Sequence, residues 1–129
     1  MILVDTHVLV WLELQPGKLS RAATSAIRRA QASGGVAISA ISLVELAGLI
    51  YRGKVRLPGS FESSLQRFIR DVTVKPITLE IAVLTSHFPP DFPSDPMDRI
   101  IAATARAENL PLVTADERIL RCPLLKTIW

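Results

Sequence analysis

The chain has 129 residues, of which 49% are hydrophobic and 21% are charged, and its formal net charge is +3. This length suits one domain, and this composition excludes a disordered chain. The longest stretch without a charged residue, 30–44, is too short to span a membrane, and no basic start of a signal peptide is visible. The single cysteine, Cys122, excludes an internal disulfide and a zinc site built from several cysteines. We therefore expect one cytoplasmic domain spanning 1–129.

Short apolar runs alternate with amphipathic helical patterns along the chain, and glycine and proline pairs separate several of them. In chain order we expect a strand at 1–4, helices at 8–14 and 20–32, a strand at 36–39, helices at 42–52 and 60–70, a strand at 72–76, helices at 78–86 and 96–109, a strand at 110–114, a helix at 116–120 and a candidate fifth strand at 125–129. This alternation predicts a three-layer α/β/α sandwich around a mainly parallel sheet of four to five strands.

Four acidic residues fall where a predicted strand ends or a predicted helix begins: Asp5, Glu45, Asp98 and Asp116. In a parallel sheet these junctions share one edge, and ligands of open α/β sheets bind beyond the carboxyl ends of the strands. We therefore expect the four carboxylates to converge on one site.

Each acid also has a purely structural explanation. Asp5 and Asp116 can cap the helices that follow them, and Asp98 can complement the dipole of its helix. Glu45 can complete a capping box with Ser42. These explanations do not account for the grouping of all four acids at the edge where α/β folds build their sites.

A set of carboxylates with few nitrogen or sulfur ligands nearby suits a hard cation, Mg²⁺ or Mn²⁺. Such an ion can polarise a phosphoryl oxygen and lower the pKa of a water molecule. An acidic site within an otherwise basic surface also suits a polyanionic substrate. The acids therefore favour metal-dependent hydrolysis of phosphodiester bonds.

Three further side chains are candidates for binding substrate. The hydroxyls of Thr6 and Thr114 can lie beside a substrate phosphate, although a local cap or strand hydrogen bond explains them equally well. Arg99 lies in the first turn of its helix, where a positive charge opposes the helix dipole, so its position suggests contact with phosphate.

Other residues near the same junctions are expected to be structural. Asp95 is predicted to cap its helix, His7 to support the site or the fold, and Trp11 and Trp129 to lie in the core. The basic residues are scattered and are not interleaved with aromatic ones, so no platform for reading single-stranded sequence is visible.

Four segments of the sequence carry a resemblance to a known family: Leu-Val-Asp-Thr-His-Val-Leu-Val-Trp at 3–11, Ser-Ala-Ile-Ser-Leu-Val-Glu-Leu at 39–46, Asp-Pro-Met-Asp-Arg-Ile-Ile-Ala-Ala at 95–103 and Leu-Val-Thr-Ala-Asp at 112–116. With these segments in family order, essentially the whole chain resembles PIN-domain ribonucleases, specifically VapC-type toxins of bacterial toxin–antitoxin systems. The resemblance implies a Mg²⁺ or Mn²⁺ site, endonucleolytic cleavage of RNA and a cognate antitoxin protein. Its acidic positions carry over onto Asp5, Glu45, Asp98 and Asp116.

Apolar residues on 8–14, 43–51 and 61–69 exceed what a small sheet needs. Together with the resemblance, they suggest a homodimer and a groove for an antitoxin segment.

Two rival functions remain open from the sequence. A flavodoxin-like receiver module also gathers acids around Mg²⁺ in order to accept a phosphoryl group, but the third predicted strand, which continues as Val-Lys-Pro-Ile at 74–77, ends without an aspartate. A non-enzymatic RNA-binding module would not need four acids at one edge, because without a metal they would repel phosphate.

Overall fold

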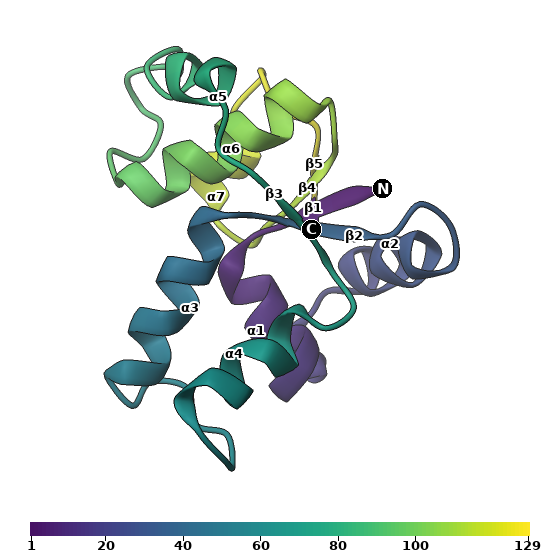
Figure 1. The fold of residues 1–129 in the computed structure, drawn as a ribbon. Helices are drawn as coiled ribbons and strands as arrows, with labels where there is room; N and C mark the ends of the chain where they lie inside the picture. The colour runs from purple at the N-terminus through teal and green to yellow at the C-terminus, as the bar shows by residue number, and fades with distance from the viewer.

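A parallel sheet lies at the centre of the computed structural model, which describes residues 1–129 (Figure 1). Its five strands are β1 (Ile2–Val4), β2 (Val36–Ser39), β3 (Thr73–Lys75), β4 (Leu112–Val113) and β5 (Thr127–Ile128). They lie in the order β3-β2-β1-β4-β5, and every neighbouring pair is parallel. The predicted fifth strand is therefore present.

The strand order excludes the receiver module. Flavodoxin-like sheets have the order 2-1-3-4-5, in which the third strand lies beside the first. Here the neighbours of β1 are β2 and β4, and β3 lies at the edge of the sheet.

Helices cover both faces of the sheet. Helices α1 (Thr6–Leu14), α2 (Arg21–Ala32) and α4 (Phe61–Ile69) lie on one side, and α5 (Leu79–Leu84), α6 (Pro96–Glu108) and α7 (Glu117–Leu120) lie on the other (Figure 1). Helix α3 (Ile41–Tyr51) contacts both α4 and α6, and a 3₁₀ turn, η1 (Pro16–Lys18), joins α1 to α2. The predicted three-layer α/β/α arrangement is confirmed.

The core explains why the strands are short continuous apolar runs. Side chains alternate between the faces of a strand, so Ile2 and Val4 pack into the larger core cluster while Leu3 packs into the smaller one on the opposite face. Because helices cover both faces, neither set of side chains reaches water.

Local interactions shift several predicted boundaries. Helix α1 begins at Thr6, two residues before the predicted start, because Asp5 caps it. Strand β4 begins at Leu112, after the predicted start at 110, because Pro111 has no N–H to donate to the ladder, and it ends at Val113. Trp129 is partly buried and packs against the larger core cluster, as predicted. Trp11 is also partly buried, with its ring centre 5.9 Å from that of Trp129, but it packs against neither core cluster, so its predicted place in the core was wrong.

None of the helices combines the length and the hydrophobicity that crossing a lipid bilayer would require.

Candidate active site

A cleft of about 360 Å³ opens at the carboxyl edge of the sheet. Its lining residues are Asp5, His7, Trp11, Glu45, Asp95, Asp98, Ala115 and Asp116. The structure thus brings together all four acids that the sequence placed at strand and helix junctions. Strands β1 and β4 are neighbours, and α3 and α6 begin at the same edge, so residues up to 111 positions apart in the chain share one cleft.

The carboxylate of Asp5 is held from two sides. Its Oδ1 accepts a hydrogen bond of 2.9 Å from the backbone N–H of His7, which makes Asp5 the cap of α1. Its Oδ2 accepts a hydrogen bond of 2.8 Å from the hydroxyl of Thr114. The Asp5 side chain remains 13% exposed, so it can cap α1 and line the cleft at the same time.

Thr114 connects two of the acids through one hydroxyl group. The hydroxyl donates to Asp5 and accepts a hydrogen bond of 3.2 Å from the backbone N–H of Asp116. Asp116 in turn caps α7 and lies 3.5 Å from the guanidinium of Arg118. Thr114 is fully buried, so the predicted contact between its hydroxyl and substrate does not fit; the residue positions carboxylates instead.

The capping box predicted for Ser42 and Glu45 does not form. The backbone N–H of Ala40 still bonds to the carbonyl of Lys75, and α3 begins directly afterwards at Ile41 with no side-chain cap. Ser42 is consequently inside the first turn and fully buried. The side chain of Glu45 is left without a hydrogen-bond or ion-pair partner in the chain, and it lines the cleft.

A buried hydroxyl pair ties the start of α1 to the start of α3. The hydroxyl of Thr6 donates a hydrogen bond of 2.9 Å to the hydroxyl of Ser42, and both residues are fully buried. Thr6, like Thr114, is therefore placed beneath the cleft and not at a position where it can contact substrate, as the sequence had suggested. The pair helps to hold Asp5 and Glu45 on facing helices.

Asp98 shows the electrostatic consequence of the convergence. Burial raises the pKa of Asp98 from 3.8 to about 6, and negative charges around it add to this effect. These charges belong, in decreasing order of effect, to Asp95, Asp5, Asp116 and Glu45. As predicted, Asp95 caps α6, and it also lines the cleft.

Arg99 does not line the cleft. Its guanidinium donates a hydrogen bond of 3.0 Å to the carbonyl of Thr85 at the end of α5, and it lies 5.8 Å from the centre of the Phe92 ring. These contacts join α5 to α6, so the predicted contact with substrate phosphate does not fit the position of this side chain.

Besides Asp95, two cleft residues, His7 and Trp11, were given structural or supporting roles from the sequence. His7 and Trp11 are four residues apart, so they lie on one face of α1, and the cap at Asp5 turns this face toward the cleft. The side chain of His7 is 59% exposed, with Nδ1 3.9 Å from Asp5 Oδ1. The cap at Asp5, which starts α1 at Thr6, was the sequence feature that could have placed both residues in the cleft.

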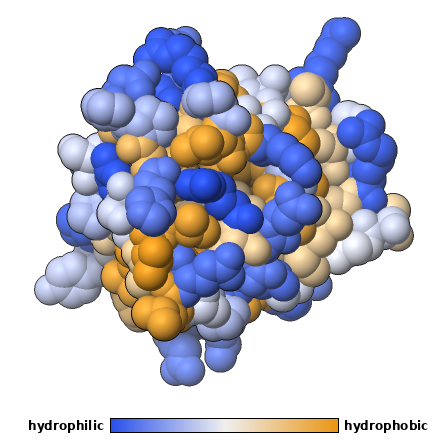
Figure 2. Space-filling model, turned by 90° about the horizontal axis from the view of Figure 1, so that it is seen from above, coloured by the Kyte–Doolittle hydropathy of each residue, from blue (hydrophilic) through white to orange (hydrophobic).

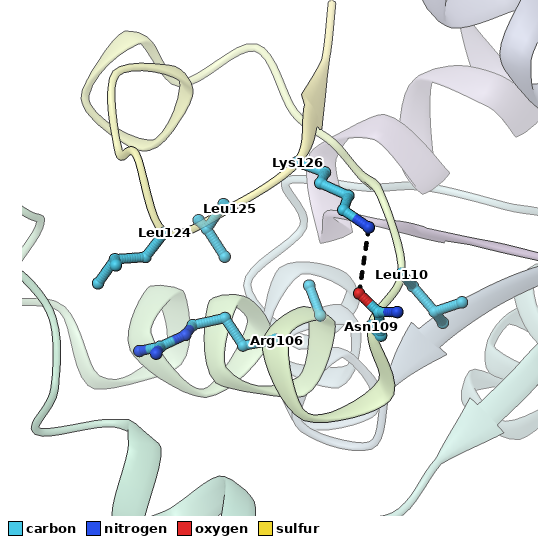
Figure 3. A pocket seen from close by; sticks show the side chains of 7 residues that line it. Arg106, Asn109, Leu110, Leu124, Leu125 and Lys126 are labelled. Atoms are coloured by element: carbon cyan, nitrogen blue, oxygen red, sulfur yellow. Dashed lines mark hydrogen bonds between the residues drawn. The ribbon is translucent and has the colours of Figure 1, made fainter.

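A smaller pocket of about 110 Å³ lies between the end of α6 and the segment that leads into β5 (Figure 3). In it, the ammonium group of Lys126 donates a hydrogen bond of 3.2 Å to the side-chain carbonyl of Asn109 (Figure 3). None of the acids of the cleft lines this pocket, so the chemistry indicated by the sequence belongs to the cleft.

The donor set of the cleft consists mainly of carboxylate oxygens, which are the ligands that Mg²⁺ and Mn²⁺ prefer. As the side chains stand, no three Asp, Glu, His or Cys residues form a group placed to hold one ion. The side chains of Glu45 and Asp98 make no hydrogen bond or ion pair. Burial, and after it the charges of the neighbouring acids, raises the pKa of Asp98, and a cation would neutralise those charges. The chemistry of the cleft therefore fits a divalent cation.

Comparisons with known proteins agree with this geometry. The profile of the PIN domain matches residues 2–123. Ribonuclease VapC22 of Mycobacterium tuberculosis is 38% identical over 130 residues, which cover 99% of this chain and 98% of the relative.

Solved structures share the fold. VapBC2 of Rickettsia felis, solved with a DNA fragment from its promoter, aligns with a TM-score of 0.74 and 21% identity over 98% of this chain and 97% of that one. DNA-bound VapBC of Salmonella typhimurium aligns with a TM-score of 0.72 and 20% identity over the same shares of the two chains. With a family profile that spans nearly all its residues and a relative of 38% identity over nearly its full length, the chain belongs to the PIN-domain family.

Proposed function

We propose that this chain, as a single domain over 1–129, is an endoribonuclease that uses a divalent cation to hydrolyse RNA phosphodiester bonds and acts as the toxin of a toxin–antitoxin pair. The observation that carries the proposal is the convergence of Asp5, Glu45, Asp98 and Asp116 on one cleft. The name of the relative from Mycobacterium tuberculosis, a ribonuclease, supports RNA as the substrate.

The four acids would hold Mg²⁺ or Mn²⁺. When bound, such an ion supplies charge neutralisation at the phosphate and activation of water for attack. Each pair of carboxylates at a separation of about 4 Å repels by roughly 4 kcal/mol at an effective dielectric constant of 20, so the acids alone would also repel RNA. A cation is therefore needed before substrate can approach the cleft.

The residues of the chain differ in how firmly they are positioned. Asp5 and Asp116 are fixed by the shared hydroxyl of Thr114 and by their own helix caps. Glu45 and Asp98 have no such partners, which leaves their carboxylates free to adjust around a cation. We assign the fixed pair to orient the ion and the adjustable pair to complete its coordination.

Purified protein should cleave single-stranded RNA when Mg²⁺ or Mn²⁺ is added and should stop when EDTA removes the ion. Gel analysis of a labelled RNA, with a DNA of the same sequence as control, measures this. Cleavage that continues unchanged in EDTA would contradict the proposal, since the cleft offers no nucleophile that could replace the ion.

An antitoxin would bind near the cleft. Val44 and Tyr51 of α3 and Phe61 of α4 are 59%, 85% and 47% exposed, and α3 contacts α4. Val44 directly precedes Glu45, so a partner segment that covers these apolar side chains would lie close to the cleft. The solved toxin–antitoxin complexes with the same fold support such a partner.

A homodimer would use a different face. The apolar surfaces of α1 and α4 pack mostly into the core, whereas Ile77, Leu79 and Val83, on and beside α5, are 47%, 83% and 51% exposed. Viewed from the side of α5 and α6, the surface shows hydrophobic side chains among hydrophilic ones (Figure 2). We therefore place the dimer interface on α5.

Light scattering should give a mass twice the 14.1 kDa of the chain at micromolar concentration. Leu79→Glu should shift the protein to a monomer, because it places a charge in the apolar interface. Phe61→Glu, an exposed apolar residue on another face, is the control and should leave the dimer intact. A wild-type monomer, or equal behaviour of the two variants, would contradict an interface on α5.

A further inference from the structure

The positive charge of the chain is concentrated in one continuous segment. Between positions 14 and 44 there are four basic residues and no acidic residue. The whole chain has a net charge of +3, so this segment, with +4, leaves the remainder with −1. The four basic residues are Lys18, Arg21, Arg28 and Arg29, at η1 and along α2.

Three of these basic residues line one groove. The exposed face of α2 forms a shallow surface groove of about 400 Å³, lined by Leu19, Arg21, Thr24, Ser25, Arg28 and Arg29. None of the three arginines forms an ion pair; Arg29 donates a hydrogen bond of 3.0 Å to the hydroxyl of Ser25. The opposite face of α2 is buried, so the arginines are directed to solvent.

The stability of α2 explains only part of this arrangement. Arg21 occupies the first position of the helix, where the dipole already carries partial positive charge and an acidic residue would be favoured. Arg29 lies in the last turn, where the dipole favours a positive charge, but the helix has no acidic residue four positions from any arginine. An anionic ligand would satisfy them.

Lys18 and Trp11 link the groove to the acidic cleft. Lys18, directly before Leu19, places its ammonium group 5.8 Å from the centre of the Trp11 ring. Trp11 lines the cleft beside His7, and their ring centres lie 6.3 Å apart. A path over the surface therefore leads from the acids past Trp11 and Lys18 to the arginines of α2.

We propose that the groove of α2 binds the phosphate backbone of single-stranded RNA on one side of the cleavage position. This inference rests on the proposed nuclease function. The acidic cleft attracts cations and repels phosphate, so affinity for RNA has to come from positive charges outside it. Arg21 and Arg28 are separated by about 10 Å along the helix axis, enough to contact more than one phosphate.

The binding test compares two pairs of substitutions that remove the same charge. Arg21→Gln with Arg28→Gln alters the groove, while Lys54→Gln with Arg70→Gln alters exposed residues that line neither the groove nor the cleft. Fluorescence anisotropy of a labelled single-stranded RNA is measured in EDTA, so that binding is separated from cleavage. Thermal melting confirms that each variant is folded.

The groove variant should bind RNA about tenfold more weakly, and the slope of log Kd against log salt should become shallower by about 1.4, or 0.7 for each phosphate that the variant no longer neutralises. The control variant should match wild type. Equal weakening in both variants would indicate a general effect of charge and overturn the proposal. Weaker binding of polyglutamate with unchanged binding of RNA would assign the groove to an acidic protein segment and overturn it as well.

Cleavage assays with added metal separate this inference from the function on which it rests. The groove variant should raise KM for a long RNA without changing kcat, and should leave KM for a very short oligonucleotide unchanged. If the groove and control variants have equal KM values and cleave normally, the groove does not bind RNA, while the proposed nuclease function is retained. If RNA binding depends on the groove but the wild-type protein cleaves no RNA, the RNA-binding role of the groove is supported and the proposed nuclease function is contradicted.

Discussion

Asp5→Asn should lower the rate constant of RNA cleavage by at least about a hundredfold, because it removes one negative charge from a cation site while keeping the shape of the side chain. The amide oxygen can still accept from the backbone N–H of His7, and its NH₂ group can face the hydroxyl of Thr114. The cap of α1 is therefore retained, and we expect the melting temperature to change little. Single-turnover cleavage of labelled RNA at saturating Mg²⁺ measures the loss.

Asp91→Asn is the matched control for this change. Asp91 is an exposed acid in the loop before α6 and does not line the cleft. The same substitution there should leave cleavage at the level of wild type. A fully active Asp5→Asn variant would show that the carboxylate serves only as a helix cap.

The convergence of the acids could be predicted because it depends on topology. In a parallel sheet every strand ends at the same edge, so Asp5 and Asp116 are brought together by the pairing of β1 with β4, whatever the details of packing. Asp98 follows the same logic, since α6 leads into β4 and must begin at that edge. The pattern of acids in the sequence was sufficient to find them.

The hydrogen-bond partners of the threonine and arginine side chains near the site could not be predicted, because these partners are distant in sequence. Thr6 donates to Ser42, 36 positions away, and Thr114 to Asp5, 109 positions away. Arg99 could have extended toward the cleft, but the free carbonyl at the end of α5 was a closer partner. Local sequence patterns contain no information on such contacts.

The position of the positive charge on the surface could not be predicted either. Taken along the sequence, the basic residues are scattered, so the sequence predicted a generally basic surface that suits a polyanion but did not indicate where on that surface the charge gathers. The fold leaves Arg21, Arg28 and Arg29 on the solvent side of α2, because Ala23, Ala26 and Ile27 between them are buried. Concentration of charge on a surface is a property of the folded helix.

Asp98→Asn should stabilise the protein when no metal is present. At neutral pH the carboxylate of Asp98 is charged, partly buried and surrounded by other acids, which raises its pKa to about 6. Removing the charge removes the cost of burying it and the repulsion by the other acids, although the helix dipole loses a favourable partner worth about 0.3–1 kcal/mol. We expect a net gain of about 1–2 kcal/mol in the free energy of unfolding at pH 7–8, because solvent screening reduces the upper limit of about 3 kcal/mol set by the shift in pKa.

The pH dependence of this gain has a defined sign. The folded state binds the proton of Asp98 more tightly than the unfolded state, whose pKa is near 3.8, so wild type loses stability as the pH rises from about 4 to about 6. The variant lacks this loss. The difference between the two proteins should therefore be small at pH 4, grow up to about pH 6 and stay constant above about pH 7. Glu62→Gln is the control, because Glu62 lies in the first turn of α4 outside the cleft. This variant should lose a few tenths of a kcal/mol in the free energy of unfolding.

Added Mg²⁺ should reverse the order of the two proteins. An ion that binds only the folded state raises its free energy of unfolding by RT ln(1 + [Mg²⁺]/Kd). Asp98→Asn should weaken Mg²⁺ binding, because it removes a carboxylate. Thermal and denaturant unfolding of wild type and variant, each in EDTA and in millimolar Mg²⁺, measures both effects. If Asp98 only complements the dipole of α6, the variant will be slightly destabilised in EDTA and both proteins will respond equally to Mg²⁺. That result would contradict a cation site formed by the converging carboxylates.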